Sequence, residues 1–221
     1  MWYNVDMKKI LLLLITLLIV QAARADFVPQ YSKTITVWGI GGVFVGQDYL
    51  IFDEPKDDAG LLQRVIWDEK GNVTCKGDCD DGMLFTLFVP SKKAVILSAV
   101  DENENWAQVC YGQKSGKLGW IRLSDDNKFT PWSQYLIKYG KTHSFYMFKD
   151  IPKDENRLYS QPEDGAKSVD SWELAKQITP WYVKGNWAMV KVINFDNTQK
   201  TGWLKWRTAD GALRGFVDPR K

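Results

Sequence analysis

Apolar runs of about six residues alternate with short polar stretches along most of this chain, and Pro, Gly, Asp or Asn marks most of the breaks. Runs of this length with such punctuation are typical of β-strands joined by tight turns. The pattern predicts strands at 34–38, 43–52, 61–67, 83–89, 94–100, 106–111, 118–123, 144–148, 156–160, 178–183, 187–195, 201–206 and 213–217. The expected fold class is therefore all-β, with short and twisted strands.

One segment carries a helical signal instead. Asp170, followed three residues later by Glu173, has the form of a capping box, in which the first side chain accepts a hydrogen bond from the backbone of the second. This spacing predicts a short helical turn from Asp170 to Gln177.

Residues 1–25 have the pattern of a secretory signal peptide. Met7 is followed by two lysines, residues 10–20 are apolar except for Thr16, and Ala23 and Ala25 are small residues at a cleavage site before Asp26. The apolar run is shorter than the roughly 20 residues of a spanning helix, although a retained anchor stays an alternative. Met7 is also a more natural start than Met1. We therefore expect a periplasmic or secreted protein with no membrane segment after cleavage.

Two passages of the chain are nearly identical in pattern. Asn-Trp-Ala-x-Val occurs at 105–109 and again at 186–190, and each copy is followed by Gly-Trp-aliphatic, at 119–121 and at 202–204. A repeat of this length indicates a duplicated structural unit. It predicts one domain over residues 26–140 and a second over residues 141–221.

The order of these motifs resembles the bacterial SH3-like (SH3b) domain family. The matching segments are 49–55, 94–100, 106–109 and 119–121 in the first unit, and 145–152, 187–190 and 202–204 in the second. The resemblance implies two small SH3-like β-barrels in tandem, with a cysteine hairpin inserted in the first and a longer stretch before Trp187 in the second. Domains of this family contact cell-wall peptides or other envelope proteins, and they carry no catalytic residues of their own.

Charge argues against a polyanionic partner. The chain has 29 Lys and Arg residues and 27 Asp and Glu residues; residues 1–25 contain three of the former and one of the latter, which leaves 26 of each in the mature chain. Nucleic-acid binding through phosphates usually needs a basic excess or a basic stripe. We therefore expect no nucleic-acid partner and no anionic membrane surface as a partner.

Three cysteines, Cys75, Cys79 and Cys110, follow the expected signal peptide. Export places them in an oxidising compartment, and Gly77 at the tip of a short loop favours a Cys75–Cys79 disulfide, although other pairings stay open. Cys110 is then expected as a buried free thiol. With His143 as the only histidine, the usual zinc-ligand spacings are missing, so we expect no metal site.

Tryptophan is the residue type most suited to carry recognition here. Those of the repeated strands, Trp106, Trp120, Trp187 and Trp203, are expected in the core or at its edge. Trp132, Trp181 and Tyr182 lie beside Pro131 or Pro180 and outside the repeated motifs, in segments expected to be loops or edges. These three are the candidate ligand-binding residues.

The sequence thus favours a binding or adaptor module of the bacterial envelope, with peptidoglycan or an envelope protein as the partner, and with no cofactor, metal or catalytic residue. Two alternatives stay open. One is a cell-wall hydrolase with Cys110 as nucleophile and His143 as base. The other is a structural or inhibitory partner of another exported protein.

Overall fold

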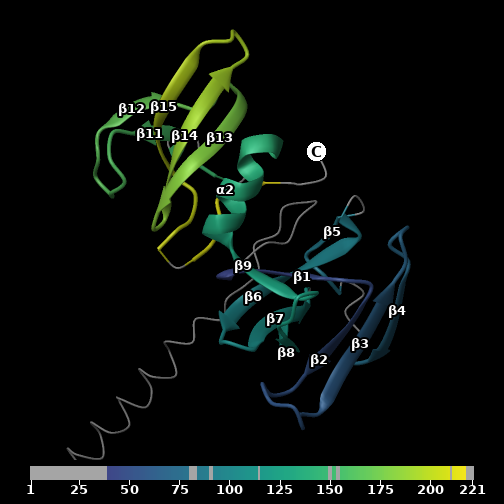
Figure 1. Ribbon diagram of the computed structural model, residues 1–221. Helices are drawn as coiled ribbons and strands as arrows, with labels where there is room; N and C mark the ends of the chain where they lie inside the picture. The colour runs from purple at the N-terminus through teal and green to yellow at the C-terminus, as the bar shows by residue number, and fades with distance from the viewer. Residues whose placement is uncertain are drawn as a thin grey trace, which may run out of the picture.

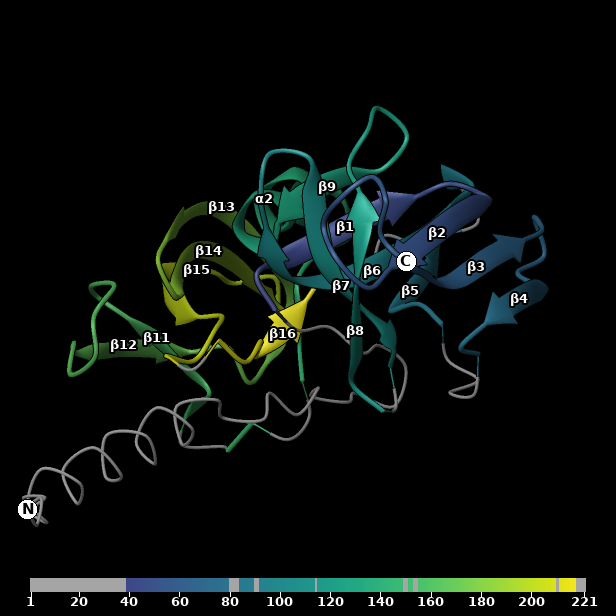
Figure 2. The ribbon, with the colours of Figure 1, turned by 90° about the horizontal axis from the view of Figure 1, so that it is seen from below.

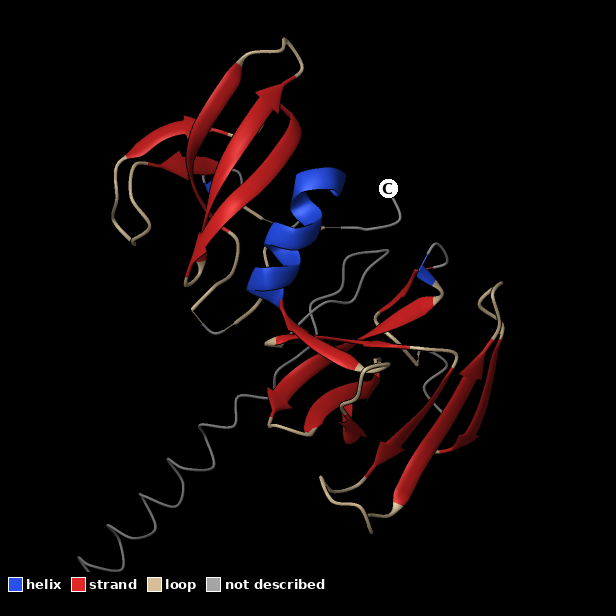
Figure 3. Cartoon of the chain, in the orientation of Figure 1, coloured by secondary structure: helices blue, strands red, loops and turns tan. Residues whose placement is uncertain are grey.

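The computed structural model describes residues 39–79, 84–89, 92–113, 115–148, 151–152, 155–209 and 211–217. Strands dominate this part of the chain, which contains one α-helix, α2 (Trp132–His143), so the expectation of a mainly β fold is confirmed. The expected signal peptide and the strand expected at 34–38 lie outside the described residues. Figure 3 shows the helix between two groups of strands.

The first group is an antiparallel sheet with the order β4-β3-β2-β8-β7-β6-β1-β9, in which β5 pairs with β6 off the main path. Its strands are β1 (Gly41–Val45), β2 (Asp48–Phe52), β3 (Leu61–Trp67), β4 (Val73–Gly77), β5 (Leu87–Val89), β6 (Ala94–Glu102), β7 (Trp106–Gly112), β8 (Lys117–Arg122) and β9 (Lys128–Pro131). Most follow the apolar runs closely, because each run provides a strand with one buried face.

The second group is a five-stranded antiparallel sheet with the order β12-β11-β15-β14-β13. Its strands are β11 (Arg157–Tyr159), β12 (Ser168–Ser171), β13 (Ala175–Lys184), β14 (Trp187–Asn194) and β15 (Gln199–Lys205). A separate short pair joins β10 (Tyr146–Met147) to β16 (Gly215–Phe216). The strand pairings among the described residues leave both sheets open at their edges, and no closed barrel is found.

The duplication seen in the sequence is present in the strand pairing. The order β3-β2-β8-β7-β6 in the first sheet corresponds to β12-β11-β15-β14-β13 in the second. The register is also the same, since Val109 pairs with Gly119 in one sheet and Val190 pairs with Gly202 in the other. The two Asn-Trp-Ala-x-Val motifs therefore occupy equivalent positions in two copies of one five-stranded arrangement.

The expected match between the two units is wrong for the strand that precedes the tryptophan motifs. The segment 145–152 was expected to correspond to 49–55, but its strand β10 pairs with β16 outside the five-stranded sheet. The true counterpart of β2 is β11, because Phe52 pairs with Trp120 and Tyr159 pairs with Trp203. An aliphatic-aromatic-x-x-Pro pattern at 51–55 and 158–162 carries this equivalence.

The loops that follow these strands agree with the corrected match. The Asp53 amide donates a hydrogen bond to the Gly60 carbonyl at 3.0 Å, and the Ser160 amide donates to the Lys167 carbonyl at 3.0 Å. The two loops thus have the same length and the same closing bond.

The expected helical turn at 170–177 is wrong. Asp170 and Ser171 belong to strand β12, and β13 begins at Ala175. The Asp170 carboxylate accepts a hydrogen bond from Lys200 Nζ at 2.6 Å instead of capping a helix. Pairing of β12 with β11 decides the backbone conformation here, because a ladder of hydrogen bonds outweighs a local capping preference.

Helix α2 joins the two sheets. Figures 1 and 2 show it between β13 on one side and β1 and β9 on the other. One buried cluster contains Leu87 and Ile96 of the first sheet together with residues of α2 and of the second sheet, whereas a second cluster lies within the first sheet. The predicted domain boundary between residues 140 and 141 falls inside α2.

Trp132 lies at the centre of this joint. Its side chain is only 2% exposed. Its ring centroid lies 5.5 Å from that of Tyr135 and 5.7 Å from that of Phe216, both edge to face. A Cβ atom on Gly42 of β1 would lie 2.7 Å from the Trp132 ring, so this glycine makes room for the indole. Trp132 therefore contacts both units at once.

Candidate functional site

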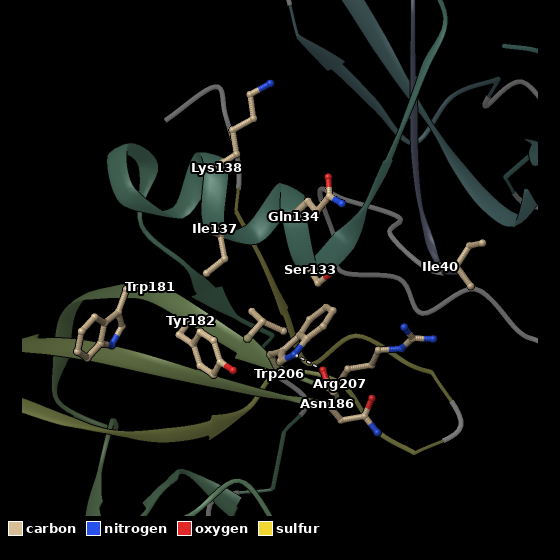
Figure 4. Close-up of a pocket in the computed structure, with 12 residues that line it drawn as sticks. Ile40, Ser133, Gln134, Ile137, Lys138, Trp181, Tyr182, Asn186, Trp206 and Arg207 are labelled. Atoms are coloured by element: carbon tan, nitrogen blue, oxygen red, sulfur yellow. Dashed lines mark hydrogen bonds between the residues drawn. The ribbon is translucent and has the colours of Figure 1, made fainter. Parts of the chain in front are cut away.

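A surface cleft of about 670 Å³ lies between α2 and the β13–β14 hairpin, and it is much larger than hollows of about 180 and 220 Å³ elsewhere on the described chain. A volume of this size is usual for small-ligand sites. The cleft is lined by Ile40, Ser133, Gln134, Ile137, Lys138, Trp181, Tyr182, Val183, Gly185, Asn186, Trp206 and Arg207 (Figure 4).

Trp206 lies in the wall nearest the protein interior and is only 2% exposed. Its indole Nε1 donates a hydrogen bond to the Gly185 carbonyl at 3.1 Å, and its backbone amide donates to the Asn186 carbonyl at 3.0 Å. Gly185 has a φ of 55°, a left-handed conformation that glycine adopts without strain, and it forms the β13–β14 turn. These bonds hold the hairpin turn against the base of the cleft.

One wall of the cleft is the exposed side of α2. Ser133 and Ile137, one helical turn apart, point into the cleft from this side, whereas the Lys138 side chain extends away from it (Figure 4). Trp132 and Leu136 face the buried cluster. The apolar spacing in 132–139 is that of an amphipathic helix, a signal the strand-centred sequence interpretation missed.

The helix is held close to the outer strand of the second sheet. A Cβ atom on Gly140 would lie 2.4 Å from Pro180 Cγ, so the absence of a side chain permits this contact. Ser144 Oγ donates to the Ile178 carbonyl and accepts from the Ile178 amide, both at 3.1 Å. The wall of the cleft is thereby fixed to β13 at one end.

The opposite wall presents Trp181 and Tyr182, each 57% exposed. Neighbouring residues of a regular strand point to opposite faces, but the β13–β14 register shifts between Pro180 and Tyr182. Such a bulge redirects side chains, which explains why both rings reach the surface. Figure 4 shows both rings on the same side of the strand, below α2.

Two of the three aromatic residues singled out from the sequence thus come together in the cleft, and the third does not. The prediction that Trp132 is exposed for ligand binding is wrong, because its ring is buried between the two sheets. Pro131, read as the mark of a loop, instead directly precedes the first residue of α2. Proline is well tolerated at a helix start, where no intrahelical donor is needed.

An aromatic row extends from the cleft across the second sheet. Tyr182 pairs with Met189, Met189 with Trp203, and Trp203 with Tyr159, each on the neighbouring strand. The rings of Tyr182 and Trp203 are 5.9 Å apart. The equivalent row of the first sheet is Asp101, Gln108, Trp120 and Phe52. The apolar row is therefore a property of the second unit, in which Tyr182 and Met189 occupy the positions of Asp101 and Gln108.

Both units also share a pair of aromatic rings with an ion pair beside it. Each places an edge-to-face ring pair near an ion pair, namely Phe52–Trp106 with Asp57–Arg122, and Tyr159–Trp187 with Asp164–Lys205. Trp106 and Trp187 are each 7% exposed, in agreement with the expectation that they belong to the core. Trp120 and Trp203 are half-buried, as expected at the edge of the core.

The charge around the cleft is of one sign. Lys138 and Arg207 are the charged residues among those that line it. The described residues that line the cleft include no Asp or Glu. The chain as a whole is nearly neutral, and the two charged residues of the lining are both basic.

Cys110 and His143 lie in different parts of the fold. Cys110 is on β7 and 0% exposed, and its Sγ donates to the Gly112 carbonyl at 3.4 Å. His143 is the last residue of α2, whose end points away from the first sheet (Figure 1). A thiol enclosed in a sheet lacks the access to substrate that a nucleophile needs.

Cys75 and Cys79 are joined by a disulfide with Cα atoms 6.0 Å apart. Within this loop, Asp78 accepts hydrogen bonds from Lys117 Nζ at 2.6 Å and from the Tyr111 hydroxyl at 2.9 Å. The bond from Lys117, followed by the one from Tyr111, lowers the pKa of the Asp78 carboxyl. Burial, together with the bond to Asp78, raises the pKa of Tyr111 to about 12. The disulfide loop is thus pinned to β7 and β8.

Within the described residues, no cluster of three or more His, Cys, Asp or Glu side chains is arranged to hold a metal ion. The described part of the chain also contains no helix that is long and apolar enough to cross a membrane. A comparison with known protein-family models found no match for this chain, and no curated protein matched its sequence.

Proposed function

We propose that this protein is an exported binding module of the bacterial envelope, and that the cleft between α2 and β13 recognises a cell-wall peptide. The observation that carries the proposal is the pair Trp181 and Tyr182, both 57% exposed on a wall of the cleft of about 670 Å³. Large rings on a fixed strand provide contact area at a low entropic cost, which makes them frequent anchors of recognition.

The composition of the cleft supports binding over catalysis. Among the described residues that line it there is no His, Cys, Asp or Glu, the side chains that most often act as nucleophile or general base. Ser133, Gln134 and Asn186 provide polar groups that can hydrogen-bond a peptide backbone. A mixed aromatic and amide lining of this kind is typical of recognition sites.

We propose further that the two units are SH3-like. The shared order of five strands and the identical register of β7–β8 and β14–β15 support a duplicated small β-unit. The pattern of residues 1–25 and the Cys75–Cys79 disulfide support export to an oxidising compartment.

A second candidate is binding to another envelope protein through a different surface. Leu174 and Phe195 are 67% and 75% exposed, and the Phe195 amide donates to the Leu174 carbonyl at 3.2 Å, so the two apolar residues are neighbours. Adjacent exposed apolar side chains are typical of protein contact sites.

The test is co-sedimentation of the protein, purified from an expressing bacterium, with purified peptidoglycan sacculi. We expect the wild type to pellet and the double variant Trp181→Ala/Tyr182→Ala to lose affinity about 30-fold, the effect of removing one strong anchor. Phe195→Ala is the matched control, since it removes an exposed ring outside the cleft. A wild type that stays in the supernatant would exclude wall binding, and a loss confined to Phe195→Ala would place the wall contact outside the cleft.

A further inference from the structure

We infer that the cleft binds the main chain of its peptide, which pairs with the free edge of strand β13 at Val183. The inference rests on the proposed function and specifies how the wall peptide is held. It follows from the direction of the backbone groups along β13, from the hydrogen bonds that some of them already make, and from the equivalent strand of the first unit.

β13 is an edge strand, because the order β12-β11-β15-β14-β13 ends with it. In an antiparallel pair, every second residue turns its amide and carbonyl away from the neighbouring strand. A two-residue turn, 185–186, joins β13 to β14, and Lys184 pairs with Trp187 directly beside this turn. Residues that flank such a turn bond to each other. The following pair, Val183 and Ala188, therefore does not, and the Val183 backbone groups point outward.

Outward positions farther from the turn face α2 and the residues that follow it. Ile178 exchanges hydrogen bonds of 3.1 Å with Ser144 Oγ, and its carbonyl also accepts from the Phe145 amide at 2.7 Å. Pro180 has no amide hydrogen and lies against Gly140 of α2. Proline occurs in sheets where its nitrogen faces an open edge. The edge of β13 is thus directed toward α2 and is covered as far as Pro180.

Val183 is the next outward position, because the bulge between Pro180 and Tyr182 adds one residue to β13. It lines the cleft opposite Ile137 of α2. Within the part of the chain that the structure describes, neither its amide nor its carbonyl forms a hydrogen bond outside the sheet. A donor and an acceptor on one residue match the main chain of an extended peptide, which offers the same two groups.

The equivalent strand of the first unit is closed at this position. Its residue Glu102 corresponds to Val183, since each pairs with the alanine of an Asn-Trp-Ala motif, next to the same bulge. The Glu102 amide donates a hydrogen bond to the Asp101 carboxylate at 2.8 Å. The counterpart of Asp101 is Tyr182, whose ring packs against Trp203 instead. Charged side chains on an edge discourage strand addition, and the second unit lacks them here.

The walls of the cleft provide contacts for the side chains of a peptide bound in this way. Alternate residues of an extended chain point to opposite sides. The rings of Trp181 and Tyr182 lie on one wall, and Ser133 and Ile137 lie on the other (Figure 4). Pairing with the edge of β13 contributes affinity, whereas these walls contribute selectivity for particular side chains.

Hydrogen exchange of the Val183 amide measures the pairing directly. The protein, free or bound to purified sacculi, is placed in deuterated buffer, quenched in acid, digested with pepsin and analysed by mass spectrometry of peptides that cover residues 181–185. Because this amide points out of the sheet, we expect fast exchange in the free protein and at least about tenfold slower exchange in the bound protein.

Val183→Pro removes the outward amide at an edge position of the kind that Pro180 already occupies. We expect it to weaken pelleting about tenfold, because a carbonyl of the peptide is left without its donor. Val183→Thr keeps the amide and nearly the same shape, so it should lose less. Glu102→Pro is the matched control, since it removes the equivalent amide of the first unit and should pellet like the wild type. Thermal unfolding shows whether each variant folds, and the exchange measurement decides alone if Val183→Pro does not.

Equal exchange of the Val183 amide in free and bound protein would overturn the inference. If Trp181→Ala/Tyr182→Ala still lost binding in that case, the proposed function would stand without pairing to the main chain. A loss for Val183→Thr as large as that for Val183→Pro would assign the effect to the side chain and would also overturn it. Failure of the wild type to pellet would instead refute the proposed function itself.

Discussion

Replacement of Trp132 by alanine tests the central claim about the architecture, that α2 joins the two units through one buried cluster. The ring is 2% exposed and lies edge to face with Tyr135 and Phe216, at 5.5 and 5.7 Å. Its removal leaves a large cavity that the backbone of β1, packed against it at Gly42, cannot fill by a small shift. Deletions of this kind lower the free energy of unfolding by about 3–5 kcal/mol.

The assay is urea unfolding followed by far-ultraviolet circular dichroism, since fluorescence would change with the tryptophan itself. We expect Trp132→Ala to lower the midpoint strongly, and Trp132→Phe, which keeps much of the volume, to lower it less. Trp181→Ala is the control and should change stability by no more than about 0.5 kcal/mol, because its ring is 57% exposed.

A loss below about 1 kcal/mol for Trp132→Ala would refute the reasoning. Such a result would place the indole at the surface, as the sequence pattern suggested. Two well-separated unfolding transitions in the wild type would also contradict it, because a cluster shared by both sheets should make them unfold together.

Two further predictions concern the disulfide loop. Reduction of Cys75–Cys79, or replacement of both cysteines by serine, should lower the free energy of unfolding by about 2 kcal/mol, the value expected for so short a loop. Thermal unfolding with and without reductant measures this loss, and an unchanged melting temperature would contradict it. The pKa of Asp78 is lowered in the folded protein, so its bonds to Lys117 and Tyr111 should stabilise the fold at pH values above the ordinary pKa of 3.8. This stabilisation should be lost as the pH falls through the lowered pKa. Asp78→Asn should therefore be less stable than the wild type at pH 7 and nearly equal to it at pH 2, and a constant difference across this range would exclude the carboxylate as the cause.

Several features of the site could be predicted from sequence. Trp181 and Tyr182 stood out because they lie beside Pro180 and outside the repeated motifs, and both are exposed. The repeated Asn-Trp-Ala-x-Val and Gly-Trp motifs also identified two equivalent strand pairs. Local pattern was sufficient here because period-two alternation and an adjacent proline act within a few residues.

Other features depended on contacts between distant segments. Trp132 was placed at the surface because its neighbour Pro131 resembled a loop signal, whereas the ring is buried by β1 and β16. The helical turn at 170–177 was replaced by strands because β12 pairs with β11. In each case a non-local partner outweighed a local preference.

The sequence by itself determined the strand-rich character of this protein, its internal duplication and the aromatic pair that lines the cleft, because these depend on residue type and short-range spacing. Only the tertiary structure decided that α2 packs against the edge strand β13, that Trp132 is buried between the sheets, and that Ile137 of α2 and the rings of Trp181 and Tyr182 line one cleft. The reason is physical: burial and charge at a site are sums over neighbours in space, and those neighbours come from parts of the chain whose proximity no local pattern encodes.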